Sequence, residues 1–105
     1  MRERFNRGDY YNRMKNGEFT AVKTRIGKPR DEILHEYGPD TLSASVSYRN
    51  QNGDEIVRVH QYESPNGEIL YKDENGVLRK DGLPDPKVLF EDGILYHLPQ
   101  KRKTV

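Results

Sequence analysis

The residues most suited to chemistry in this sequence lie in the segment Arg58–Tyr62, which reads Arg-Val-His-Gln-Tyr. In a β-strand, side chains two residues apart point to the same face, so Arg58, His60 and Tyr62 would lie side by side. An imidazole transfers protons near neutral pH, and a guanidinium or an ammonium stabilises a phosphate oxyanion. Together with Lys87, these residues could form a small metal-independent nuclease or toxin. A strand face that contacts only solvent explains the same pattern.

A second set of residues combines aromatic and basic side chains near the start of the chain. Its members are Arg4, Arg7, Tyr10, Tyr11 and Arg13. Rings that stack on bases and arginines that contact phosphates are typical of proteins that bind single-stranded nucleic acid. Tyr and Arg are also enriched at protein–protein hot spots. A terminal helix that packs Phe5, Tyr11 and Met14 onto a sheet is a third interpretation, and the sequence leaves all three open.

Metal and cofactor chemistry has little support in the sequence. The chain has no cysteine, which excludes disulfides, thiol catalysis and cysteine-based zinc sites. Adjacent acids such as Asp73 and Glu74 would point to opposite faces of a strand and could not jointly hold a metal ion. The phosphate-loop, dinucleotide-binding, zinc-protease and hydrolase motifs are absent. We therefore expect no metal and no cofactor.

Charge is segregated along the chain, although 18 Lys and Arg residues nearly balance 17 Asp and Glu residues. Residues 1–30 contain nine basic and three acidic residues, and residues 31–98 contain six basic and fourteen acidic residues. Residues 99–105 add three more basic residues. The basic ends could contact the phosphates of a nucleic acid, or they could only offset the charge of the acidic middle.

The length of 105 residues fits a single domain. We expect a basic N-terminal arm over about 1–16 and a disordered basic tail over 99–105, because Pro99 ends the last expected strand and little that follows can be buried. No apolar run is long enough to span a membrane, and the first residues lack the apolar stretch of a signal peptide. These features predict a cytoplasmic protein that does not contact a membrane.

Turn-forming pairs divide most of the chain into short strands. The pairs are Asn52-Gly53, Asn66-Gly67, Asn75-Gly76 and Asp92-Gly93. Runs of β-branched and aromatic residues predict strands at 18–26, 42–48, 55–62, 68–72, 77–80, 88–90 and 94–98. Residues 41–62 are predicted to form a hairpin that turns at 50–54. Because Leu42, Ala44 and Val46 alternate with serines, these three should share one buried face.

Two short helices are predicted, at about 9–15 with Asp9 as its N-cap and at about 29–37. The segment Leu83–Lys87 contains two prolines, which cannot donate backbone hydrogen bonds, so we expect it to cross outside the sheet at an edge or end. The sequence therefore predicts an α+β fold, mostly an antiparallel β meander with one or two short helices.

From Val57 onward the chain carries four short motifs in a distinctive order. They are His60-Gln61-Tyr62, Pro65-Asn66-Gly67, Pro84-Asp85-Pro86-Lys87 and Asp92-Gly93-Ile94-Leu95-Tyr96. This order resembles the C-terminal half of small, uncharacterised bacterial proteins that share His-Gln-Tyr, Pro-Asp-Gly, Pro-Asp-Pro-Lys and Asp-Gly-x-x-Tyr. Asn66 replaces the Asp of that pattern. The resemblance implies a stand-alone cytoplasmic protein, and it implies no activity.

Two classes of function remain. The first is a non-catalytic binding module that engages nucleic acid or protein through its basic and aromatic residues. Exposed sheet edges could also pair two copies into a homodimer. The alternative is the metal-independent nuclease at Arg58 and His60.

Overall fold

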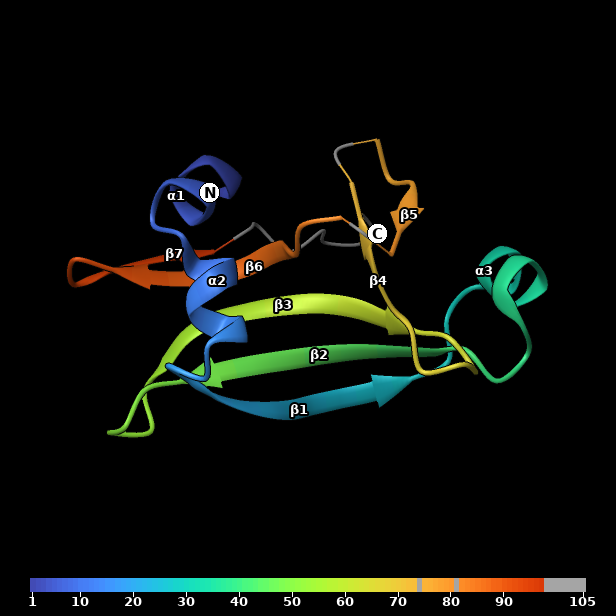
Figure 1. Ribbon diagram of the computed structural model, residues 1–105, viewed down its shortest axis with the longest axis horizontal. Helices are drawn as coiled ribbons and strands as arrows, with labels where there is room; N and C mark the ends of the chain where they lie inside the picture. The colour runs from blue at the N-terminus through green and yellow to red at the C-terminus, as the bar shows by residue number, and fades with distance from the viewer. Residues whose placement is uncertain (74, 81, 98–105) are drawn as a thin grey trace, which may run out of the picture.

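The computed structural model describes residues 1–73, 75–80 and 82–97 (Figure 1). These residues form α1 (Arg2–Arg7), α2 (Tyr10–Lys15), β1 (Thr20–Gly27), α3 (Asp31–Tyr37), β2 (Leu42–Arg49), β3 (Glu55–Glu63), β4 (Ile69–Lys72), β5 (Leu78–Arg79), β6 (Asp85–Glu91) and β7 (Ile94–His97). All strand pairs are antiparallel, which confirms the predicted fold class. The three helices are too short to cross a membrane. The predicted disordered tail at 99–105 lies outside the described residues.

Three loops of the sheet share one construction, and each contains an Asn-Gly pair. In each loop, a side-chain oxygen of the first residue accepts a hydrogen bond from the backbone amide of the fifth residue. The first residues are Asn50, Ser64 and Asp73. The fourth residue is a glycine with φ between 79° and 84°, a left-handed conformation that glycine adopts without a steric cost. Local sequence therefore determines these turns.

β2 and β3 form the predicted hairpin, and the chain turns at residues 50–54. Ala44 and Val46 are buried on one face of β2, as expected. The prediction that Leu42 is buried beside them is wrong, because 43% of its surface is exposed. Leu42 begins β2 opposite Glu63, at the end of the hairpin away from α2 (Figure 1).

We expect the amide hydrogens of residues 43–48 to exchange slowly with solvent. β2 lies between β1 and β3, so its backbone groups are bonded on both sides. Amides on the outer side of β1 provide an internal comparison, since β1 is a terminal strand and pairs with β2 alone. Hydrogen exchange followed by NMR tests this expectation. Uniformly fast exchange over residues 43–48 in the intact protein would contradict the hairpin.

β6 is an internal strand of the sheet, with β3 on one side and β7 on the other. The prediction that Leu83–Lys87 lies outside the sheet is therefore wrong, because β6 begins at Asp85. Pro86 pairs with Val59 where the register of β3 and β6 shifts. Such a shift is a place where a sheet tolerates a proline, because one backbone donor is not needed there.

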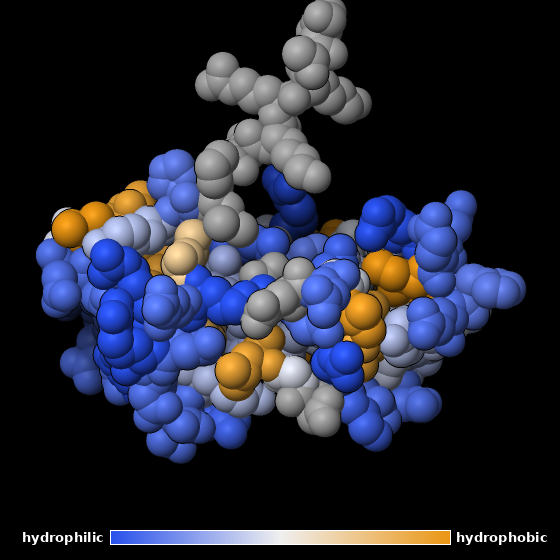
Figure 2. Space-filling model, turned by 90° about the horizontal axis from the view of Figure 1, so that it is seen from above, coloured by the Kyte–Doolittle hydropathy of each residue, from blue (hydrophilic) through white to orange (hydrophobic). Residues whose placement is uncertain are grey.

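The main core lies on the face of the sheet that α1 and α2 cover. Its buried residues are Phe5, Tyr10, Met14, Phe19, Val46, Val57, Val59 and Leu89. Residues 1–16, predicted as a basic arm, thus form two helices that supply three of these side chains. α1 was not predicted from the sequence. The surface in Figure 2 is mostly hydrophilic, with its hydrophobic residues in separate small patches.

The start of α2 differs in detail from the prediction. Asp9 is the N-cap residue, but its side chain makes no capping bond to the backbone and instead accepts a hydrogen bond from Asn12 Nδ2 at 2.7 Å. The backbone of Asp9 is left-handed, with φ of 57°. This conformation breaks the chain between α1 and α2, so the two short helices change direction at Gly8 and Asp9.

A smaller core holds α3 against the sheet. Its buried residues are Ile33, Tyr62 and Leu70, with Tyr37 and Leu78 packed beside them. Side chains of successive strand residues alternate between faces, so Tyr62 lies on the opposite face of β3 from Val57 and Val59. The two cores therefore lie on opposite faces of the sheet, and α3 confirms the helix predicted at about 29–37.

Candidate binding pocket

His60 lies on the β3 face opposite the main core. Its Nε2 is 2.6 Å from Ser43 Oγ, and its ring centroid is 4.8 Å from that of Tyr62. The structure thus brings His60 and Tyr62 together, as expected, and adds Ser43 from the neighbouring strand. Sequence reasoning did not select Ser43, although the serine alternation of β2 places it on this face.

The other members of the expected nuclease set are already engaged. Arg58 Nε and Nη2 donate to the two carboxylate oxygens of Glu55, at 3.0 and 2.7 Å. These bonds raise the pKa of Arg58. Tyr62 is 5% exposed within the smaller core, and Lys87 is half-buried at the register shift of β6. The set therefore does not present a free guanidinium beside His60.

Among the basic and aromatic residues near the N-terminus, Arg4 and Tyr10 stabilise the contact of the helices with β6 and β7. Tyr10 is buried, and its hydroxyl donates to Glu91 Oε2 at 2.9 Å. Burial and this carboxylate raise the pKa of Tyr10. The Arg4 guanidinium lies 4.4 Å from the ring centroid of Tyr96 and 3.7 Å from Glu91. The buried Tyr10 ring is therefore not available to stack on a base, whereas the Arg4 side chain stays 42% exposed.

Arg13 also acts within the fold. Its guanidinium lies 4.6 and 5.2 Å from the ring centroids of Tyr10 and Phe19. Its Nε donates to Glu18 at 2.9 Å, which raises the pKa of Arg13 and lowers that of Glu18. Arg7 is exposed on α1. Of the five residues predicted to bind a partner, Tyr11 lines the cavity described next.

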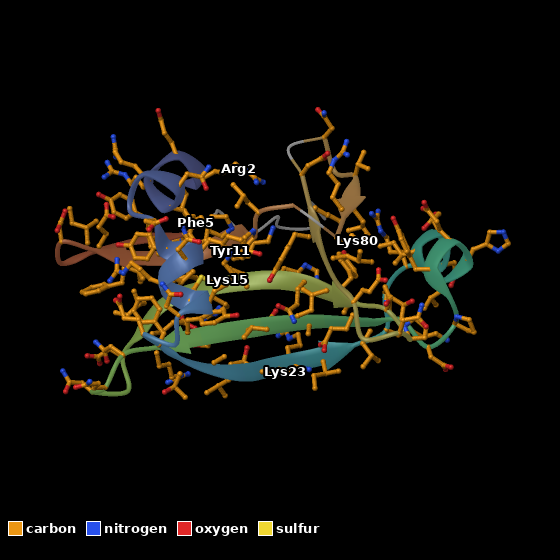
Figure 3. The ribbon with its side chains drawn as sticks, viewed as in Figure 1. Arg2, Phe5, Tyr11, Lys15, Lys23 and Lys80 are labelled. Atoms are coloured by element: carbon orange, nitrogen blue, oxygen red, sulfur yellow. The ribbon has the colours of Figure 1, made fainter. Side chains whose placement is uncertain are left out.

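That cavity, which we call the tyrosine pocket, has a volume of about 430 Å³ and lies on the same face as the main core. It is lined by Tyr11, Met14, Lys15, Tyr48, Gly67, Ile69, Tyr71 and Lys80. Tyr11 and Lys15 come from α2 on one side, and Lys80, which directly follows β5, lies on the other (Figure 3). Tyr48 and Tyr71, from β2 and β4, complete the aromatic lining.

The three tyrosines form one aromatic cluster. The rings of Tyr11 and Tyr71 meet edge to face, with centroids 6.5 Å apart. Burial raises the pKa of Tyr71, and its neighbours Tyr48 and Tyr11 raise it further. Burial likewise raises the pKa of Tyr48. Both phenols are therefore protonated at neutral pH and can donate hydrogen bonds.

Among the described residues that line the pocket, the charged ones are Lys15 and Lys80, and none is a carboxylate. Lys15 Nζ lies 4.5 Å from the ring centroid of Tyr11, an arrangement in which the ring attracts the ammonium. Within the described chain, neither lysine forms an ion pair. Two ammonium groups beside one cavity give the pocket a local positive charge, which favours an anionic group.

We expect the buried tyrosines to ionise at a higher pH than the exposed tyrosines. The raised pKa values of Tyr10, Tyr48 and Tyr71 mean that folding keeps them protonated. Their contribution to stability is complete below about pH 10 and is lost as the pH rises toward the raised values. A spectrophotometric titration should show some of the seven tyrosines ionising only as the protein unfolds. Ionisation of all seven near pH 10 in a folded protein would contradict this.

The tyrosine pocket could not be found from the sequence, because its residues are distant along the chain. Elsewhere, no three His, Asp or Glu side chains of the described residues gather in a way that could hold a metal ion. Comparisons with models of protein families, with curated proteins and with solved structures found no match. The resemblance noted from the sequence stays a prediction.

Proposed function

We propose that this protein is a non-catalytic binding module that engages an anionic macromolecule at the tyrosine pocket. The observation that carries the proposal is the pairing of Lys15 and Lys80 with three tyrosines around one cavity, with no carboxylate among the described residues that line it. The volume of about 430 Å³ lies within the range of about 300–1,000 Å³ that is usual for ligand pockets. A nucleic acid and an acidic protein segment both carry the required charge. A cytoplasmic location stays a prediction.

Removing the two pocket lysines tests the proposal. We expect Lys15→Gln with Lys80→Gln to weaken binding of labelled oligothymidylate or poly-glutamate, measured by fluorescence anisotropy at low salt. Each lost phosphate contact should lower the salt-dependence slope for the oligonucleotide by about 0.7. The matched control is Lys28→Gln with Arg30→Gln, which removes the same charge at exposed positions that do not line the pocket.

The control variant should bind as the wild type does. Equal losses in both double variants would show that net charge, and not the pocket, attracts the probes. Failure of both probes to bind the wild type would overturn the proposal.

The second candidate function is the nuclease, which the 2.6 Å contact of Ser43 Oγ with His60 Nε2 favours. General acid–base catalysis contributes a factor of about 10²–10⁴, so His60→Ala would abolish measurable cleavage if this candidate were correct. As a binding module, the protein should instead show no cleavage of labelled RNA, and His60→Ala should retain wild-type affinity for oligothymidylate. Cleavage that depends on His60 would reverse this choice.

The sequence left open a homodimer through a sheet edge. β1 is one terminal strand of the sheet, and all eight of its residues are exposed. It also carries Lys23 and Arg25 on either side of a register shift. Basic residues and irregular pairing oppose the addition of a second strand, so we expect a monomer in sedimentation experiments. A stable dimer that Thr24→Pro dissociates would show that the edge pairs.

A further inference from the structure

The tyrosine pocket combines a flat aromatic and apolar lining with cations on two sides. Tyr11, Tyr48 and Tyr71 supply the rings, and Met14 and Ile69 supply apolar contacts. Lys15 and Lys80 stand on opposite sides, one on α2 and one directly after β5 (Figure 3). A ligand that fits this lining has a flat ring for the cavity and negative charge that extends beyond it. A nucleotide within a strand has both.

We infer that the partner at the tyrosine pocket is single-stranded nucleic acid, with an unpaired base among the tyrosines and its phosphates at Lys15 and Lys80. This inference rests on the proposed function and names its partner. Bases stack on aromatic side chains regardless of sequence, because every base has a π-face. The protonated phenols of Tyr48 and Tyr71 can donate hydrogen bonds to the polar edge of the base.

An acidic peptide fits the same features less well. Its carboxylates would satisfy the lysines, but aspartate and glutamate offer no flat ring for the cavity. Duplex DNA fits less well for a different reason. Its bases are paired and stacked, so a base would have to leave the helix to enter the pocket. The acidic residues of segment 31–98 would also repel a long duplex laid across the surface, whereas a short strand needs attraction at the pocket alone.

Three labelled oligonucleotide probes separate these possibilities. The probes are oligothymidylate, a duplex of oligothymidylate with oligoadenylate, and an abasic strand that has the same number of phosphates as oligothymidylate. We expect the wild-type protein to bind oligothymidylate about 5- to 150-fold more tightly than the abasic strand, the range measured for one base stacked on an aromatic ring. Duplex should bind more weakly than oligothymidylate although it carries twice as many phosphates, because its bases are paired and stacked.

Tyr11→Leu removes a ring from the pocket and keeps an apolar side chain of similar size. It should reduce the preference for oligothymidylate over the abasic strand and leave the abasic affinity unchanged. Lys15→Gln with Lys80→Gln should weaken both strands. If Tyr11→Leu does not fold, ultraviolet crosslinking of 4-thiothymidine-substituted strands to the wild type gives the same information, because the crosslinked peptide should contain Tyr11, Tyr48 or Tyr71.

The outcomes also separate this inference from the proposed function. Equal affinity for the abasic strand and oligothymidylate, with loss of both in the double lysine variant, would retain an anion-binding pocket and overturn the inserted base. Tighter binding of duplex than of oligothymidylate, or binding of poly-glutamate alone, would retain the anion-binding pocket and overturn single-stranded nucleic acid as its partner. No binding of any probe would overturn both.

Discussion

Replacing Phe5 by Ala is expected to lower the free energy of unfolding by about 3–5 kcal/mol, the usual cost of removing a buried phenylalanine ring. Phe5 is 0% exposed and stacks on Tyr10, with ring centroids 5.9 Å apart. It belongs to the main core with Val57 and Leu89, so its loss leaves a cavity between α1 and the sheet. Chemical denaturation followed by circular dichroism measures the change.

Asn6→Ala is the matched control, because Asn6 is the next residue of α1 and is exposed. We expect it to change the free energy of unfolding by less than about 0.5 kcal/mol. Similar small effects of both substitutions would mean that residues 1–16 are an arm that does not pack on the sheet. A large effect of Phe5→Ala alone would support a structural role for the N-terminal helices.

Replacing Thr41 by Val is expected to stabilise the protein by about 1–3 kcal/mol, the cost of burying a polar group that makes no hydrogen bond. Thr41 is 1% exposed, and among the described residues its Oγ1 has no hydrogen-bond partner. Val has nearly the same shape as Thr, so the substitution removes the buried hydroxyl without creating a cavity. The midpoint of denaturation should rise with an unchanged dependence on denaturant.

Thr20→Val provides the comparison, because Thr20 is exposed at the start of β1 and its hydroxyl is not shielded from water. We expect little change in stability for this variant. A loss of stability in Thr41→Val would show that the hydroxyl makes a bond in solution and would contradict the expectation.

Local signals in the sequence were sufficient for the turns and for most strands. An Asn-Gly pair needs no distant contact to form its turn, since the glycine adopts positive φ and a side-chain oxygen three residues before it closes the loop. Alternation of apolar and polar residues in 42–48 likewise predicted β2. These features depend on neighbours along the chain, so they could be predicted.

The order of the strands depended on contacts that local signals do not encode. Two prolines in Leu83–Lys87 argued against a strand, yet β6 begins at Asp85 and pairs with β3. The reason lies in the main core, where Leu89 packs with Val57, Val59 and Phe5. Burial of these side chains outweighs the lost donor of Pro86, because the register shift leaves that position without a required hydrogen bond.

The candidate site also depended partly on local sequence and partly on tertiary contacts. The sequence by itself determined that tyrosines and basic residues are abundant in α2, but it did not distinguish Tyr10 from Tyr11. Successive residues of an α-helix point about 100° apart, so Tyr10 turns toward Glu91 and the main core while Tyr11 turns toward the pocket. Tertiary structure alone decided that Tyr48, Tyr71 and Lys80 meet Tyr11, because only strand pairing and helix packing bring residues so distant in sequence to one cavity.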